Sequence, residues 1–112
     1  MTLGNQQREF TRLIGRLIEH AYVSGYELTF GEAYRPPEQA ALNAAKGTGI
    51  KNSLHTRRLA VDLNLFKDGV YLTQSEHWRD LGEWWERQHP LCRWGGRFGD
   101  GNHLSMEYGG VK

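Results

Sequence analysis

The chain has 112 residues, of which 14 are basic and 13 acidic, so its formal net charge is +1. This length suits a single domain, residues 1–112, and the near-neutral charge argues against a nucleic-acid-binding protein. The single cysteine, Cys92, excludes an intrachain disulfide and a cysteine-based zinc cluster. Neither a membrane helix nor a secretory signal is recognisable. We therefore expect a monomer, made in the cytoplasm, without stable membrane association.

The first predicted element is a helix from about Asn5 to Ser24, with Gly25 as its stop. Apolar residues recur through this segment at helical spacing, which is typical of a helix that packs one face against a core. The stripe consists of Phe10, Leu13, Ile14, Leu17, Ile18 and Ala21.

A strand is expected next, within residues 26–35, with Leu28 and Phe30 on one face. Two prolines end this strand, and proline suits the first turn of a helix. They introduce a short alanine-rich helix over residues 38–46, and residues 49–53 should then form a loop.

The segment LAVDLNLF, residues 59–66, alternates with the period of two that predicts a strand. A carboxylate in such an apolar run is costly to bury unless an arginine, a backbone donor or a metal ion pairs with it. The alternation turns Asp62 away from the apolar face. That face carries Leu59, Val61, Leu63 and Leu65, and the other carries Ala60, Asp62 and Asn64.

The sequence KDG, residues 67–69, predicts a turn, so residues 70–73 should return as a hairpin partner. Thr73 and Glu76 resemble a capping box at the start of a further helix. This helix should end before Pro90. Its apolar side carries Trp78, Leu81 and Trp85.

Residues 95–102 are rich in glycine, which predicts a loop, and residues 103–108 alternate again as a strand. His103 lies on the polar side of that alternation, as Asp62 does in its own strand. In chain order the elements are a helix, a strand, a helix, a hairpin, a helix and a final strand pair. They predict an α+β fold, a small antiparallel sheet with helices packed on one side.

His55, Asp62 and His103 form a candidate metal set of two imidazoles and one carboxylate. Zinc in hydrolytic sites commonly takes three protein ligands of these types and keeps one position for water. Such a site needs a base near that water, and Asp100, three residues before His103, is a candidate. Histidine and aspartate clusters also serve phosphodiester cleavage, but the near-neutral charge argues against a nuclease, which usually shows a basic face.

Three segments resemble the M15 zinc peptidases, which include D-alanyl-D-alanine peptidases and phage-type L-alanyl-D-glutamate endolysins. SLHTRRLAVD, residues 53–62, is similar to their Ser-x-His-x-x-Gly-x-Ala-x-Asp signature. WGGRFGDGNHLSM, residues 94–106, is similar to a second signature, in which a Trp-Gly-Gly run precedes acid-x-x-His. EAYRPPEQ, residues 32–39, is similar to a strand-end arginine segment. The three occur in family order.

The resemblance implies a Hedgehog/DD-peptidase-like fold and Zn²⁺ bound by His55, Asp62 and His103. It implies Asp100 as the general base and Arg35 as the positive group near the substrate carbonyl or carboxylate. Ser53 matches the signature serine and is expected to contact substrate or a neighbouring ligand. One departure concerns the signature glycine, which falls at Arg58.

The function expected on this basis is zinc-dependent hydrolysis of an amide bond in peptidoglycan stem peptides. An L-alanyl-D-glutamate endopeptidase of the phage or prophage endolysin type is favoured, acting on the cell wall after release from the host cytoplasm. Two alternatives stay open. One is a D-alanyl-D-alanine carboxypeptidase, and the other is a non-catalytic, zinc-stabilised wall-binding module of the same fold.

Overall fold

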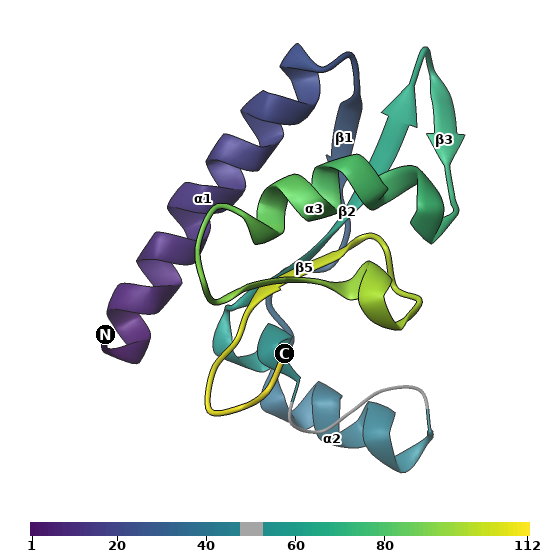
Figure 1. Ribbon diagram of the computed structural model, residues 1–112. Helices are drawn as coiled ribbons and strands as arrows, with labels where there is room; N and C mark the ends of the chain where they lie inside the picture. The colour runs from purple at the N-terminus through teal and green to yellow at the C-terminus, as the bar shows by residue number, and fades with distance from the viewer. Residues whose placement is uncertain (48–52) are drawn as a thin grey trace.

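A computed structural model describes residues 1–47 and 53–112 (Figure 1). Over these residues the chain forms three α-helices, five strands and three short 3-10 helices. The α-helices are α1 (Leu3–Val23), α2 (Pro37–Ala45) and α3 (Arg79–Glu86). The strands are β1 (Glu27–Phe30), β2 (Ala60–Lys67), β3 (Val70–Leu72), β4 (Cys92–Trp94) and β5 (His103–Met106). The 3-10 helices are η1 (Leu54–Arg57), η2 (Ser75–Trp78) and η3 (Gly95–Phe98).

Strand β2 organises an antiparallel sheet, because it pairs with three other strands. β1 runs along one edge of β2, opposite residues 63–66. The other edge is shared, since β5 pairs with residues 60–62 and β3 pairs with residues 65–67. β4 lies beyond β5 and completes the sheet. The predicted α+β class with a small antiparallel sheet is confirmed.

Helices α1 and α3 cover the apolar face of the sheet, as Figure 1 shows. The rings of Phe10 on α1 and Trp85 on α3 meet edge to face, with centroids 5.8 Å apart. Helix α2 stands apart from this layer and contributes only Ala40 to the buried residues. None of the described helices is long and apolar enough to span a membrane. Except for Ser53, the predicted loop 49–53 lies outside the described residues.

The core combines the predicted apolar faces of the first helix and of β2. Burying such side chains contributes roughly 1.5–3 kcal/mol each relative to full exposure, which is the main favourable term for a chain of this size. Helix α1 begins at the Thr2 cap, whose Oγ1 accepts a hydrogen bond from Asn5 N at 3.1 Å. It stops before Gly25, which has the positive φ of 93° expected of a helix stop.

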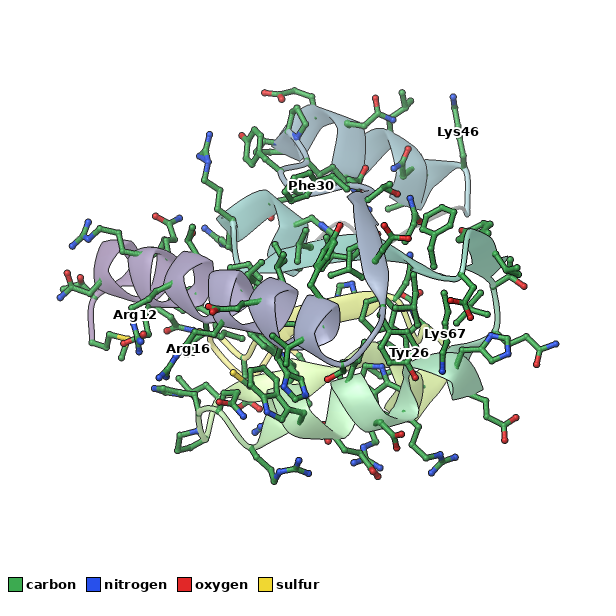
Figure 2. The ribbon with its side chains drawn as sticks, turned by 90° about the horizontal axis from the view of Figure 1, so that it is seen from above. Arg12, Arg16, Tyr26, Phe30, Lys46 and Lys67 are labelled. Carbon is green, nitrogen blue, oxygen red and sulfur yellow. The ribbon has the colours of Figure 1, made fainter. Side chains whose placement is uncertain are left out.

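Phe30 differs from the sequence-based expectation. Leu28 and Phe30 lie opposite Leu65 and Leu63, so they share a face as predicted. Phe30 is nevertheless 75 % exposed (labelled in Figure 2), because it ends the strand at the rim of the α1 layer and lines an open apolar pocket there with Tyr34. Alternation gives the face of a side chain but not how far the helix above it extends.

The predicted capping box was wrong by one residue. The box is formed by Gln74 and His77, whose Nδ1 accepts a hydrogen bond from Gln74 N at 3.3 Å, and it opens η2 rather than an α-helix. Thr73 lies between the end of β3 and this cap. The glycine-rich stretch 95–102 is not a plain loop either, because its first half winds into η3.

Candidate metal centre

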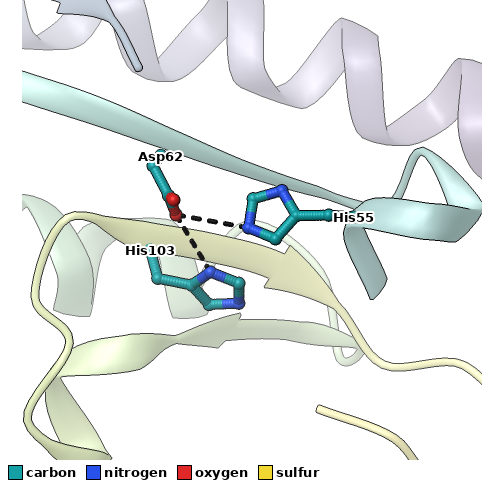
Figure 3. A group of neighbouring side chains, drawn as sticks. All are labelled: His55, Asp62 and His103. Atoms are coloured by element: carbon teal, nitrogen blue, oxygen red, sulfur yellow. Dashed lines mark hydrogen bonds and ion pairs between the residues drawn. The ribbon is translucent and has the colours of Figure 1, made fainter. Parts of the chain in front are cut away.

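Three side chains from different elements, η1, β2 and β5, converge on the face of β2 that carries Asp62 (Figure 3). Asp62 and His103 are direct partners in the β2–β5 pairing. Their side chains meet with Asp62 Oδ1 3.1 Å from His103 Nδ1. His55 approaches from η1 and places its Nε2 3.4 Å from the same oxygen. The structure thus brings together the three residues singled out as candidate ligands.

The orientation of His55 is set by a backbone carbonyl. Its Nδ1 lies 2.8 Å from Ala33 O, and since a carbonyl can only accept, Nδ1 carries the proton. When the ring is protonated, Nε2 donates to Asp62, and when the ring is neutral, Nε2 offers its lone pair to a metal ion. A second partner that fixes the tautomer in this way is typical of histidines that bind metals. The side chain is also buried, which restricts its movement.

Ser53 holds the turn that carries His55. Its Oγ accepts a hydrogen bond from His55 N at 3.2 Å, as the N-cap of η1. Its carbonyl accepts a further bond from the Thr56 hydroxyl at 2.6 Å. Ser53 is only 4 % exposed, so the observed position serves a neighbouring candidate ligand, one of the two roles expected of it.

Arg58, at the position of the signature glycine, has a backbone conformation that glycine adopts more readily than other residues. Its φ and ψ are 57° and 35°, in the left-handed region, and it ends η1 so that the chain can turn into β2. Its guanidinium lies 4.0 Å above the centre of the Tyr34 ring. A cation over an aromatic face is stabilising, and this contact offsets part of the cost of a left-handed arginine.

The three side chains perturb one another's pKa values. Burial alone would raise the pKa of Asp62, but hydrogen bonds from His103 and His55 outweigh it and hold the pKa well below its usual range. Burial alone would lower the pKa of His55, but the hydrogen bonds with Asp62 and Ala33 raise it above 6.5. An ionised carboxylate therefore sits between two imidazoles, which is the charge arrangement that attracts a cation.

Asp100 lies beside this cluster, at the start of the turn into β5. Its Oδ2 is 3.9 Å from His103 Nδ1, and its side chain is 53 % exposed. Partial burial raises the pKa of Asp100; His103 opposes this shift, and the negative charge of Asp62 adds to it. A carboxylate with a raised pKa is a better proton acceptor, so the position suits the base that the sequence predicted.

Arg35 lies on the opposite side of the cluster, next to η1. Its backbone N–H donates to His55 O at 3.2 Å. Its guanidinium is held by Glu32, through Nε at 2.9 Å and through Nη2 to the same Oε1. Glu32 Oε1 also lies 3.9 Å from His55 Nδ1. Glu32 and Arg35 therefore form an ion pair at one rim of the site.

Residues 31–33 support the centre, and sequence reasoning missed their role. Gly31 N donates to Asp62 O at 2.8 Å, and Asp62 N donates to Glu32 O at 2.7 Å, so this segment extends the β1 edge past Asp62. A methyl group on Gly31 would lie 2.8 Å from that Asp62 oxygen. Because Gly31 and Ala33 act through their backbones, only the glycine left a signal in the sequence.

The donor set fits zinc. Within the described part of the chain, the ligand atoms of His55, Asp62 and His103 all lie within 4.8 Å of one another. Four-coordinate zinc, with bonds of about 2.0–2.2 Å to nitrogen and oxygen, keeps its ligand atoms roughly 3.4 Å apart. The two donor separations from Asp62 Oδ1, 3.1 and 3.4 Å, are close to this spacing. That these residues bind the metal stays a prediction.

No protein-family model matches the sequence, and no curated protein matches it. Solved structures do match. One is the Serratia marcescens L-Ala D-Glu endopeptidase ChiX, with a TM-score of 0.74 and 18 % identity over 89 % of this chain and 79 % of that one. Another is a mutant of the vancomycin-resistance D,D-pentapeptidase VanY from the VanB-type cassette, in complex with Zn(II). Its TM-score is 0.57, with 19 % identity over 88 % of this chain and 70 % of that one.

At such low identity these likenesses establish a shared fold. They agree with the fold implied by the sequence resemblance to the M15 zinc peptidases. The α+β domain described here is therefore built like that of the L-Ala D-Glu endopeptidase and that of the D,D-pentapeptidase.

Proposed function

We propose that this chain is a zinc-dependent peptidase that hydrolyses an amide bond in peptidoglycan stem peptides. The observation that carries the proposal is the convergence of His55, Asp62 and His103, with the carboxylate of Asp100 3.9 Å from His103. This cluster occurs on a fold shared with two peptidases, one of them in complex with Zn(II).

Bound by these three side chains, zinc would lower the pKa of a water molecule towards neutrality and polarise the scissile carbonyl. The residues of the chain supply the proton transfers. Asp100, whose carboxylate lies 3.9 Å from His103, accepts the proton of the attacking water and delivers it to the leaving amine. Arg35, held by Glu32, provides positive charge near the developing oxyanion or a substrate carboxylate.

We favour the bond between L-alanine and D-glutamate, as in an endolysin of phage or prophage origin acting at the cell wall. The likeness to ChiX supports this choice, because that structure is an L-Ala D-Glu endopeptidase and gives the higher TM-score of the two. The likeness to VanY keeps a D-alanyl-D-alanine carboxypeptidase as the second candidate.

The test is mass spectrometry of purified peptidoglycan after incubation with three samples. These are the zinc-loaded protein, the same protein stripped with a chelator, and the stripped protein resupplied with zinc. Cuts between L-alanine and D-glutamate in the first and third samples alone would support the endopeptidase. Loss of terminal D-alanine would move the assignment to the carboxypeptidase.

A non-catalytic wall-binding module is the remaining alternative. Absence of any product from the zinc-loaded sample, with stoichiometric zinc confirmed by elemental analysis, would favour it over both peptidases. The position of Asp100 argues against this alternative, because a pure binder needs no proton acceptor beside its metal centre.

A further inference from the structure

A cavity adjoins the metal centre, and we call it the hairpin pocket. It has a volume of about 250 Å³ and lies between the β2–β3 hairpin, the start of η2 and the loop of residues 99–102. Asp100 belongs both to this lining and to the surroundings of His103. Asn64, two residues beyond Asp62 on the same face of β2, also lines it. The pocket is thus a continuation of the proposed active site.

The lining of the hairpin pocket is polar but almost free of charge. Asp100 is the only charged side chain among the described residues that line it, and lysine and arginine are absent from that lining. The other polar side chains are amides and hydroxyls, which both donate and accept hydrogen bonds. They belong to Asn64, Tyr71, Thr73, Gln74, Ser75 and Asn102.

Internal hydrogen bonds hold these walls in place. Asn64 Nδ2 donates to Thr29 Oγ1 at 3.2 Å, and Asn64 Oδ1 accepts from the Tyr71 hydroxyl at 3.4 Å. Across the pocket, Ser75 Oγ accepts from Gly101 N at 2.9 Å. Such preorganised groups lose little freedom when a ligand binds, which favours affinity.

Tyr71 gives the pocket an aromatic surface. Its side chain is 52 % exposed, and its ring stacks on Phe66 with centroids 5.1 Å apart. A fixed, accessible aromatic ring beside amides and hydroxyls suits a ligand with one apolar ring face and several hydroxyl groups. That combination describes a sugar better than it describes a charged side chain.

An extended peptide is a poorer occupant of this pocket. Peptides commonly bind by adding a strand to a free sheet edge, but the edge of β2 at the pocket is already taken. β3 pairs with residues 65–67, and Leu63 N donates to Asn102 O at 3.1 Å. The pocket therefore offers side chains rather than an unpaired strand.

We propose that the hairpin pocket binds an N-acetylated sugar unit of the glycan strand to which the stem peptide is attached. The inference rests on the proposed function, because it assigns the two sides of the proposed active site to the two sides of the cleaved bond. Arg35 lies on the β1 edge of β2 and the pocket lies on the β3 and β5 edge. The uncharged sugar and the L-alanine joined to it lie on the pocket side of the cut, and the anionic D-glutamate lies towards Arg35.

The test compares two soluble substrates of the zinc-loaded protein. One is a disaccharide-tetrapeptide, and the other is the same tetrapeptide with an acetylated amino terminus in place of the sugars. The wild type should give a higher kcat/KM on the first. Removing one wall group, in Asn64→Ala or Tyr71→Ala, should lower the ratio of the two kcat/KM values roughly 2–10-fold, as loss of one or two neutral hydrogen bonds predicts. Val70 is exposed, lies next to Tyr71 on β3 and does not line the pocket, so Val70→Ala should leave the ratio unchanged.

Equal kcat/KM values for the two substrates would overturn the sugar subsite while leaving the peptidase intact. A fall that is equal on both substrates in the pocket variants would also overturn it, since the pocket would then bind peptide. If neither substrate is cut, sugar binding is tested on its own. The peptide-free disaccharide is titrated into the zinc-loaded protein, and the amide signals are followed by NMR. Shifts at Asn64 and Gln74 would support the sugar site even though the peptidase proposal had failed. The absence of shifts would reject the sugar site as well.

Discussion

One carboxylate oxygen serves both histidines of the candidate centre. Asp62 Oδ1 lies 3.1 Å from His103 Nδ1 and 3.4 Å from His55 Nε2. In the metal-free protein this oxygen is the common acceptor for the protons of two imidazoles (Figure 3). A metal ion that replaced those protons would gain all three ligands with modest movements of the side chains, because both histidine nitrogens already lie at about the zinc-site spacing from Asp62 Oδ1.

Replacing Asp62 should therefore abolish stoichiometric zinc. In Asp62→Ala the site keeps two neutral imidazoles and loses its only anionic donor. The affinity should fall by more than the roughly 10–100-fold that the loss of an outer-shell partner costs. Competition with a chromophoric chelator measures it. Asp80→Ala, which removes an exposed carboxylate from the first turn of α3, is the control and should bind zinc as the wild type does. Unchanged affinity in Asp62→Ala would reject the ligand assignment.

Zinc binding should release protons, and more of them at lower pH. The pKa of His55 is raised above 6.5 in the metal-free fold, so its proton persists to a higher pH than on a free histidine. Zinc must displace that proton, and its apparent affinity should weaken as the pH falls through the raised pKa. Asp62 is ionised throughout this range, because its pKa is lowered, and contributes no proton.

Calorimetric titrations in two buffers with different ionisation enthalpies give the number of protons released. The number should be larger at pH 6.5 than above the raised pKa of His55. The raised pKa of His55 also sets the direction in which pH changes the stability of the metal-free fold. Protonation of His55 stabilises the metal-free fold below pH 6.5, and this contribution is lost as the pH rises through the raised pKa. A proton count independent of pH would contradict the assignment of His55.

Asp100→Asn should separate metal binding from turnover. The side chain is half exposed and lies 3.9 Å from His103, so its replacement by a neutral isostere leaves the fold and the three donor atoms in place. Loss of the proton acceptor should lower kcat by about 10²–10⁴-fold. Zinc content measured on the same sample should stay stoichiometric. A variant with wild-type kcat would remove Asp100 from the mechanism.

The sequence was sufficient to predict where two of the three candidate ligands point. A period of two in residues 59–66 and in residues 103–106 turns Asp62 and His103 off the apolar faces of their strands, and the β2–β5 pairing sets them opposite each other. The alternation in β5 gave an incomplete account of burial, since Ser105 on the same side as His103 is fully buried. Alternation reports the face and not what covers it.

The position of His55 could not be predicted from periodicity. It depends on a single turn of η1, on the left-handed backbone of Arg58, and on a hydrogen bond to Ala33 O. The carbonyl of Ala33 leaves no mark in the sequence, because every residue has one. The capping box was misplaced because its actual members, Gln74 and His77, are not the Ser or Thr and Glu or Gln that mark such a box in a sequence.

Gly31→Ala should disturb the centre from its supporting strand. The added methyl group would lie 2.8 Å from Asp62 O and 3.3 Å from Asp62 Cβ, closer than ordinary van der Waals contact, so the backbone beside the ligand must shift. We expect a loss of about 1–3 kcal/mol in the free energy of unfolding in urea, together with weaker zinc binding. Gly15→Ala is the matched control, since its methyl group would meet no atom within 4 Å. In mid-helix that change should stabilise by about 0.5–1 kcal/mol. Equal effects of the two changes would contradict the role of Gly31.

Two replacements of Arg58 should isolate the cost of its backbone conformation. Both Arg58→Gly and Arg58→Ala remove the contact between the guanidinium and the Tyr34 ring, worth about 0.5–1 kcal/mol at an exposed site. Only glycine also relieves the left-handed φ of 57°. The free energy of unfolding of Arg58→Gly should therefore be about 1–2 kcal/mol higher than that of Arg58→Ala. It should equal or exceed that of the wild type. Urea unfolding of the metal-free proteins measures both differences. If the two variants were equally stable, the turn after His55 would not need the conformation observed here, and the correspondence of Arg58 with the signature glycine would lose its physical basis.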